Sequence, residues 1–226
     1  MGIFYIVSTP IGNMEDITLR ALRILGEVDM IACEDTRKTG MLLKHHGIIN
    51  KPNLISLYEE NEEIRTPQII SALKEGKNVA LVSNAGTPLL SDPGFRLARQ
   101  AIHEGVKVES IPGPSALLSA LVSSCLPMDK FLFLGFLPKK PIRQQKIFDQ
   151  IKNHDQMTII FYESPYRLKK TLDLLKQNIG NVEISIGREL TKLHEEIFRG
   201  TIEQAIDHFS GQIKGEITIV LLWQKA

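Results

Sequence analysis

Short runs of apolar, mostly β-branched residues alternate along the chain with longer stretches whose apolar residues recur every three or four positions. Runs of the first kind are typical of buried strands, and stretches of the second kind are typical of helices with one buried face. The pattern predicts nine strands, at residues 4–7, 30–33, 53–57, 79–83, 106–111, 131–134, 158–162, 183–186 and 217–222. Strands that alternate with helices indicate an α/β fold.

The stretches between these strands predict helices. One amphipathic helix is expected over residues 17–25, and another follows Pro165, with its leucines along one side. Residues 91–94, Ser-Asp-Pro-Gly, have the composition of a helix cap followed by a first turn with proline. Residues 115–126 predict a largely apolar helix.

A change in the pattern near residues 112–128 suggests two domains. The turn Pro112-Gly113-Pro114 closes one series of strand–helix units, and a second series starts after the apolar helix. We therefore expect an N-terminal α/β domain at residues 1–113 and a C-terminal α/β domain at residues 114–226, with residues 114–128 as a bridging helix and linker.

Composition narrows the class of protein. The formal net charge of +1 gives no overall field that would attract DNA or a membrane, so a charged partner must be recognised by local patches. The first residues lack the basic start of a signal peptide, and no apolar stretch is long enough to span a bilayer. Cys33 and Cys125 have no partner spacing, and no Cys/His cluster suggests a metal. We expect a soluble protein of a reducing compartment, without a bound metal.

Three turn-rich loops follow predicted strands, at residues 8–13, 84–88 and 112–116. In open α/β sheets, ligands bind at the carboxyl ends of the strands. Glycine and alanine allow a ligand to approach the backbone, and proline keeps a loop rigid. Any single loop of this kind is explained by an ordinary turn. The three together favour a site for a flat, neutral ligand such as an adenosine.

Several well-known motifs are missing from the chain. It contains neither G-x-G-x-x-G after the first strand nor G-x-x-x-x-G-K-[ST], so nucleotide sites of those kinds are not supported. It contains neither H-E-x-x-H nor G-x-S-x-G, so no hydrolase of those kinds is indicated.

Charged residues gather in three segments. Residues 32–37 place Glu34 and Asp35 at the end of a strand beside Arg37, where Asp35 could equally serve as a helix N-cap. Residues 187–196 are rich in charge and suit either a solvated turn or a cleft that tunes the protonation of a reacting hydroxyl. Residues 138–146 are basic and suit either an exposed helix start or contact with phosphates.

Seven of these segments, in this order, resemble the tetrapyrrole methylase superfamily, the class III methyltransferases that depend on S-adenosyl-L-methionine (SAM). The resemblance extends from about residue 3 to residue 222 and is strongest to the branch that acts on ribosomal RNA. The matching segments are residues 9–13, 34–37, 85–88, 91–94, 112–116, 161–165 and 188–192. The chain departs from the family at Asn84, where an aspartate is usual, and asparagine can still accept a hydrogen bond.

The resemblance implies two α/β domains with SAM in the cleft between them, a homodimer, and a cytoplasmic enzyme. It implies 2′-O-methylation of a cytidine in the decoding region of small-subunit (16S) ribosomal RNA, and we expect recognition of the assembled 30S particle. By motif position, the cofactor contacts implied are Pro10, Ala85, Gly86, Thr87, Leu90, Ser115, Ala116, Tyr162 and Gly200.

Methyl transfer to a ribose hydroxyl needs precise positioning and a group that accepts the hydroxyl proton. As catalytic residues lining the RNA-facing side we expect Glu34, Asp35, Arg37, Glu189 and Lys192. Among them, Glu189 or Asp35 is the expected proton acceptor, with Lys192 as an electrostatic helper. Phosphate contacts are expected from Lys139, Lys140, Arg143 and Lys146.

Two other functions stay open. A methyltransferase of the same superfamily that acts on a tetrapyrrole, another small molecule or a protein would share the fold, since fold alone does not decide the substrate. A non-catalytic module that binds SAM and regulates a partner would share the cofactor loops. The charged segments at residues 34–37 and 188–196 favour the ribosomal branch.

Overall fold

The computed structural model describes residues 1–49 and 52–225 and divides them into two compact units, residues 1–115 and 116–226. We call them unit 1 and unit 2. The division falls two residues after the expected one, and the predicted bridging helix belongs to unit 2. In the described part of the chain, no helix has both the length and the apolar character needed to cross a bilayer.

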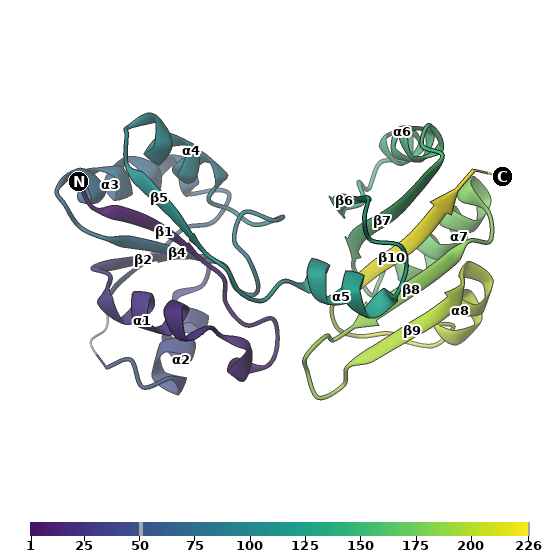
Figure 1. The fold of residues 1–226 in the computed structure, drawn as a ribbon, viewed down its shortest axis with the longest axis horizontal. Coiled ribbons are helices and arrows are strands. Elements are labelled where there is room, and N and C mark those ends of the chain that lie inside the picture. Colours follow the sequence, from purple (N-terminus) through teal and green to yellow (C-terminus); the bar gives the residue numbers. More distant parts are fainter. Residues whose placement is uncertain (50–51, 226) are drawn as a thin grey trace. The chain divides into compact units, whose positions relative to one another are not determined.

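Unit 1 contains a parallel five-stranded sheet with the order β3-β2-β4-β1-β5 (Figure 1). Helices α1 and α2 cover one face of the sheet, and α3 and α4 cover the other. The strands are β1 (Ile3–Val7), β2 (Met30–Cys33), β3 (Asn53–Ser56), β4 (Val79–Val82) and β5 (Lys107–Ile111). The helices are α1 (Leu19–Glu27), α2 (Thr36–His45), α3 (Glu62–Lys74), α4 (Phe95–His103) and the 3₁₀ turn Met14–Asp16.

Each face of this sheet has its own core, because all residues of the central strands β2 and β4 are buried. Phe4, Ala32 and Leu81 pack toward α3 and α4, whereas Val7 and Ile31 pack toward α1 and α2. In a parallel sheet covered on both faces, the side chains along the strands are mostly apolar, so the polar side chains lie at the strand ends. The candidate chemistry of unit 1 therefore concentrates in the loops at the carboxyl edge.

The prediction that Ser91-Asp92 caps a helix with Pro93 in its first turn is wrong. Helix α4 starts only at Phe95, and its N-cap is Gly94, whose φ of 109° lies in the left-handed region and which makes no side-chain cap. The orphan amide of Leu97 instead donates to the buried carboxylate of Glu62 on α3, at 3.0 Å. A tertiary contact has replaced the local cap, so Asp92 is free for another role.

Unit 2 contains a mixed sheet with the order β6-β7-β10-β8-β9, in which β6 is parallel to β7 and the other pairs are antiparallel. Helices α6, α7 and α8 form the core with one face, and α5 packs on β10 and β8 (Figure 1). The strands are β6 (Phe131–Phe136), β7 (Gln156–Glu163), β8 (Glu183–Arg188), β9 (Glu196–Thr201) and β10 (Ile217–Gln224). The helices are α5 (Ala116–Ser124), α6 (Pro141–Lys152), α7 (Leu168–Ile179) and α8 (Ile202–His208).

All nine predicted strands are present, and β9 is an additional one. It pairs antiparallel with β8 at the edge of the sheet, and its residues are only half-buried. Glu196 and Arg199 interrupt its apolar residues, so it lacks the continuous apolar run of a buried strand. The charged segment at residues 187–196 is therefore mainly the connection of a hairpin.

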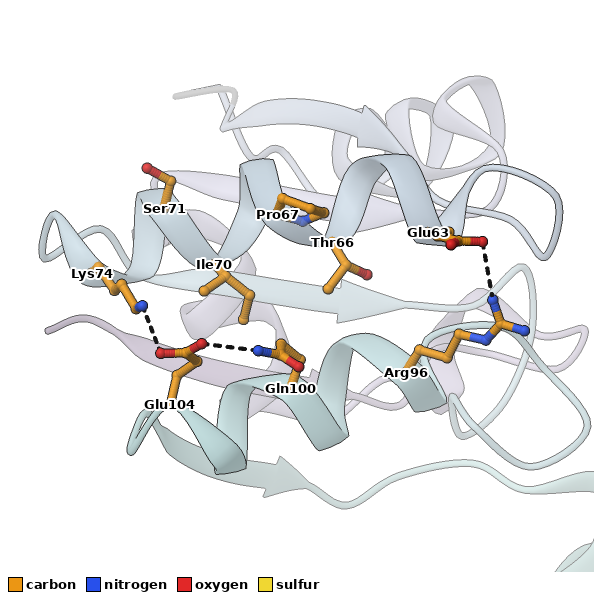
Figure 2. Close-up of a pocket in the computed structure, with 9 residues that line it drawn as sticks. All are labelled: Glu63, Thr66, Pro67, Ile70, Ser71, Lys74, Arg96, Gln100 and Glu104. Atoms are coloured by element: carbon orange, nitrogen blue, oxygen red, sulfur yellow. Dashed lines mark hydrogen bonds and ion pairs between the residues drawn. The ribbon is translucent and has the colours of Figure 1, made fainter.

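A groove of about 520 Å³ runs between α3 and α4 (Figure 2). Ion pairs cross it at two places, between Lys74 and Glu104 at 2.6 Å and between Arg96 and Glu63 at 3.8 Å. None of the expected site residues lines this groove. None of its lining residues belongs to the loops at residues 8–13, 84–88 and 112–116.

Candidate functional site

The three turn-rich loops of unit 1 are joined at the carboxyl edge of its sheet. Thr9, after β1, and Gly86, after β4, exchange two backbone hydrogen bonds of 2.9 Å and form an isolated β-bridge. The amide of Ser8 donates to the carbonyl of Ile111 at 3.2 Å, which ties the first loop to the end of β5. Loops far apart in the sequence thus form one surface.

Side chains reinforce this junction. The Thr87 hydroxyl donates to the carbonyl oxygen of Pro114 at 3.1 Å and lies 3.0 Å from the Ser8 hydroxyl. Because Thr87 uses its proton on Pro114, Ser8 donates to Thr87. The Ser83 hydroxyl, at the end of β4, donates to the carbonyls of Ala85 and Gly86 at 3.1 and 3.3 Å. These bonds hold the loops in a defined conformation before any ligand arrives.

The geometry of Gly86 suits a ligand held by main-chain groups. Its φ of 79° lies in the left-handed region, and a Cβ there would lie 3.3 Å from the Ile11 side chain. Within residues 1–49 and 52–225, the amides of Ala85 and Thr87 donate to no other group. A small-residue surface with unused amides fits a flat adenosyl group.

The expected cofactor residues divide between the units. In unit 1, Pro10 and Ser115 are buried, and Leu90 has 40% of its surface exposed. In unit 2, Ala116 is the first residue of α5, and Tyr162 and Gly200 lie on β7 and β9, with β10 and β8 between them.

The structure does not bring Tyr162 and Gly200 to one face of their sheet. Tyr162 alternates with Ile159 and Phe161, which belong to the helix-covered core, so its ring lies on the opposite face. A Cβ at Gly200 would meet the side chain of Gln204 on α8. Gly200 therefore faces the helices.

Asp35 has the structural role that its sequence position suggested as an alternative. It is the N-cap of α2, accepts the Arg37 amide at 2.9 Å and forms a bidentate pair with the Arg37 guanidinium. Hydrogen bonds from Arg37 lower the pKa of Asp35 to about 2. A carboxylate held this way is a weak base near neutral pH.

Asp92 is a carboxyl group with the opposite character. Its segment, residues 91–94, resembles the family, but Asp92 was not among the expected catalytic residues. It is half-buried on the loop between β4 and α4, where Leu89 and Ser91 both adopt left-handed conformations with φ of 74° and 71°. Burial raises the pKa of Asp92 to about 6, the nearby Glu34 adds to the rise, and a hydrogen bond with Ser83 opposes it. Strained backbone and a perturbed carboxyl group are both typical of functional sites. The missed signal was an aspartate in a loop at the carboxyl edge of the sheet.

Glu189 and Lys192 form a compact ion-pair network with Glu216. The Lys192 ammonium lies 2.9 Å from a carboxylate oxygen of each glutamate, and Glu189 also accepts the Glu216 amide at 2.9 Å. The hydrogen bond from Lys192 lowers the pKa of Glu189. Burial opposes the charge of Lys192, but its bonds to the two glutamates outweigh burial and raise its pKa. This network keeps both groups charged and fixes the β8–β9 connection.

Part of the segment at residues 161–165 also has a structural role. Glu163 is buried at the end of β7, where it accepts the Thr171 hydroxyl at 2.6 Å and pairs with Arg167 at 3.2 Å. Arg167 in turn donates to the Leu137 carbonyl at 2.8 Å. The pair of Glu163 and Arg167 therefore anchors the chain that follows β6.

The four basic residues expected to bind phosphate surround the start of α6. Lys139, Lys140, Arg143 and Lys146 are exposed, and none of them forms an ion pair with another described residue. The first turn of α6 contains no acidic residue. Because positive charge at a helix N-terminus is unfavourable for the helix, helix stability does not account for this segment.

The fold and the joined loops define a class of protein. Residues 4–206 match the family model of the Tetrapyrrole (Corrin/Porphyrin) Methylases, and the chain belongs to this family. Within it, the chain is similar to proteins named ribosomal RNA small subunit methyltransferase I. The protein of this name from Thermotoga maritima is 49% identical over 98% of both chains, and that from Hydrogenobaculum sp. is 48% identical over 96% of this chain and 94% of its own.

Solved structures share the fold. Diphthine synthase aligns with a TM-score of 0.72 at 15% identity, over 97% of this chain and 90% of its own. Uroporphyrin-III-C-methyltransferase from Thermus thermophilus aligns with a TM-score of 0.64 at 20% identity, over 97% of this chain and 94% of its own. These names describe different substrates on one fold, so the fold alone does not determine the substrate of this chain.

Proposed function

We propose that the protein transfers a methyl group from SAM to the 2′-hydroxyl of a cytidine in the decoding region of small-subunit (16S) ribosomal RNA. The observation that carries this proposal is the 49% identity, over 98% of both chains, with a relative named for small-subunit ribosomal RNA methylation. A homodimer that acts in the cytoplasm on the assembled 30S particle fits this substrate.

The loops of unit 1 support the choice of cofactor. Thr9 and Gly86 hold the first two loops together, and the unused amides of Ala85 and Thr87 suit the polar edge of an adenosine. When bound, SAM supplies an electrophilic methyl group on a sulfonium. The chain contributes rigidity: loops already fixed by hydrogen bonds lose little entropy on binding.

The ribose hydroxyl loses its proton as its oxygen forms a bond to the methyl carbon and the bond from that carbon to sulfur breaks. We assign Asp92, beside Glu34, as the acceptor of this proton. A carboxylate with a pKa of about 6 is ionised at neutral pH and is a better base than an ordinary aspartate. Asp35 and Glu189 remain candidates for the same role, but their lowered pKa values make them weaker bases.

The remaining charged residues are proposed to meet the RNA. Arg37 and Lys192 suit this role because each is a cation beside a carboxylate that keeps it oriented. The unpaired basic residues around the start of α6 suit RNA phosphates.

The test is transfer of a labelled methyl group from SAM to purified small ribosomal subunits that lack the modification. The proposal expects label on the RNA, located on the ribose of one cytidine by nuclease digestion and mass spectrometry. Label on a porphyrinogen precursor or on a protein would instead favour another methyltransferase of the family. SAM binding by calorimetry without transfer to any of these would favour a regulatory module.

A further inference from the structure

The edge strand β6 contains an irregularity that turns one aromatic ring onto a different face of the sheet. Phe133 pairs with Ile160 and Phe136 pairs with Tyr162, so three steps along β6 match only two along β7. The extra residue is a bulge that contains Gly135 in the left-handed region, with φ of 62°. Without the bulge, the alternation of a strand would direct Phe133 and Phe136 to opposite faces. Bulges commonly re-aim a side chain near a functional site.

The bulge gathers four rings on the face opposite the helix-covered core. We call Phe131, Phe133, Phe136 and Tyr162 the aromatic patch. The Tyr162 ring lies between two of the others, with its centroid 5.1 Å from Phe133 and 5.5 Å from Phe136. Phe136 and Phe131 have 55% and 43% of their surface exposed. Exposed, clustered phenylalanines on an edge strand lower the solubility of a protein unless they serve binding.

The aromatic patch continues directly into positive charge. Lys139 and Lys140 follow Phe136 after three and four residues, a length of chain of at most about 14 Å. Both ammonium groups are exposed and form no ion pair with another described residue. Neutral rings beside unneutralised cations match the two parts of an unpaired nucleotide, its base and its phosphates. A protein partner bound at this edge of the sheet would not require the positive charge.

We propose that the aromatic patch is a stacking platform for an unpaired base of the RNA substrate, with the base on Phe136 and the adjoining phosphates at Lys139 and Lys140. This inference rests on the proposed function and names the surface that would hold the RNA. Tyr162, a cofactor contact expected from the resemblance, is itself part of the platform, so the stacked base belongs at or next to the methylated nucleotide. Sequence-specific RNA recognition commonly uses single-stranded bases stacked on aromatic side chains.

The test compares F136L with F136Y. Leucine retains apolar volume but removes the ring, and tyrosine retains the ring. We expect F136L to raise the dissociation constant for purified, unmethylated small subunits by about 5- to 100-fold, and F136Y to stay within about threefold of the parent protein. Affinity for SAM by calorimetry, thermal unfolding and the oligomeric state should not change in either variant. I102A, which removes an exposed apolar side chain at the far end of α4, is the matched control.

Three outcomes would overturn the inference. F136L could bind small subunits as tightly as the parent protein, it could lose affinity for SAM instead, or it could change the oligomeric state, which would identify the patch as an interface between copies. If the parent protein itself transfers no methyl group to small subunits, the proposed function fails. If the parent protein transfers it and F136L binds normally, only the inference fails.

Discussion

Thr9 and Gly86 lie on loops that follow different strands, yet their backbones exchange two hydrogen bonds of 2.9 Å. The bridge gives the carboxyl edge of the first sheet a fixed surface in place of two independent turns. Gly86 adopts a left-handed conformation at this point, with φ of 79°. The conformation and the close side chain of Ile11 both require glycine.

We predict that Gly86→Ala will raise the dissociation constant for SAM by at least about tenfold. A left-handed alanine costs about 1–2 kcal/mol, and its Cβ, 3.3 Å from Ile11, would push the loop away from Thr9. Calorimetry with SAM measures the effect directly. Gly105→Ala is the matched control, since Gly105 has a φ of 74° but no atom within 4 Å of the added Cβ. Equal affinities of the two variants would remove Gly86 from the cofactor site.

Most of the fold could be predicted because the strands are strongly apolar. The central strands β2 and β4 are buried along their whole length, so their sequences contain no polar interruption. Strand β9 was missed because it lies at a sheet edge and carries Glu196 and Arg199. The cap of α4 was misassigned because Glu62, which accepts the Leu97 amide, lies on another helix. A local sequence pattern does not predict a contact between residues as far apart in the sequence as Glu62 and Leu97.

The site was harder to predict because its electrostatics depend on tertiary contacts. The sequence places Glu34 and Asp35 side by side, but only the structure distinguishes their surroundings. Asp35 is neutralised by Arg37, whereas the charge of Glu34 is near enough to Asp92 to raise the pKa of that carboxyl group. Asp92 lies in the segment at residues 91–94 that resembles the family, but the motif does not predict its burial or the left-handed conformations of Leu89 and Ser91. The position of the loops could be predicted from the sequence. That Asp92 is the carboxyl group with the raised pKa could not.

Asp92→Asn tests the proton acceptor. We expect the rate of methyl transfer to fall by about 10²- to 10⁴-fold, while affinities for SAM and small subunits stay within a few-fold. In the parent protein, the rate at saturating substrates should fall as pH decreases through about 6, because protonation removes the base. Single-turnover transfer measured from pH 5 to pH 8 checks both points. Asp173→Asn, an exposed aspartate on α7, is the control.

Asp92→Asn should also make the fold more stable at neutral and higher pH, whereas loss of a carboxylate that held the fold together would make it less stable. The folded pKa of Asp92 lies above its ordinary value of 3.8, so its ionised form destabilises the fold. This penalty is full above pH 6, shrinks as pH falls toward 3.8 and is absent below that value. We expect the variant to be about 1–3 kcal/mol more stable at pH 8 and to lose that gain near pH 4, as measured by denaturant unfolding. A variant that is less stable at pH 8 would contradict the assignment.

Glu189→Gln addresses the competing candidate. The lowered pKa of Glu189 means that its carboxylate stabilises the fold above its ordinary value of 4.5, and that this contribution is lost as pH falls through the lower, folded value. The variant should lose about 1 kcal/mol at pH 7 and little at pH 3, because the bond from Lys192 needs the charge. Glu189→Gln should keep the fall in the rate of methyl transfer near pH 6. The control Glu60→Gln, which changes an exposed glutamate, should alter neither the free energy of unfolding nor this pH profile. If Glu189→Gln instead lowered the rate by 10²-fold or more with RNA binding intact, Glu189 would be the base.

The basic residues at the start of α6 are tested by salt. Each phosphate contact contributes about 0.7–0.9 to the slope of log affinity against log salt concentration. The double variant Lys139→Ala/Lys140→Ala should therefore flatten this slope for small subunits by about 1–2 and weaken binding most at low salt. Lys169→Ala/Lys170→Ala, an exposed lysine pair on α7, removes the same charge from another surface and should leave the slope nearly unchanged. Equal slopes for the two double variants would mean that the field of the whole protein, and no local contact, attracts the RNA.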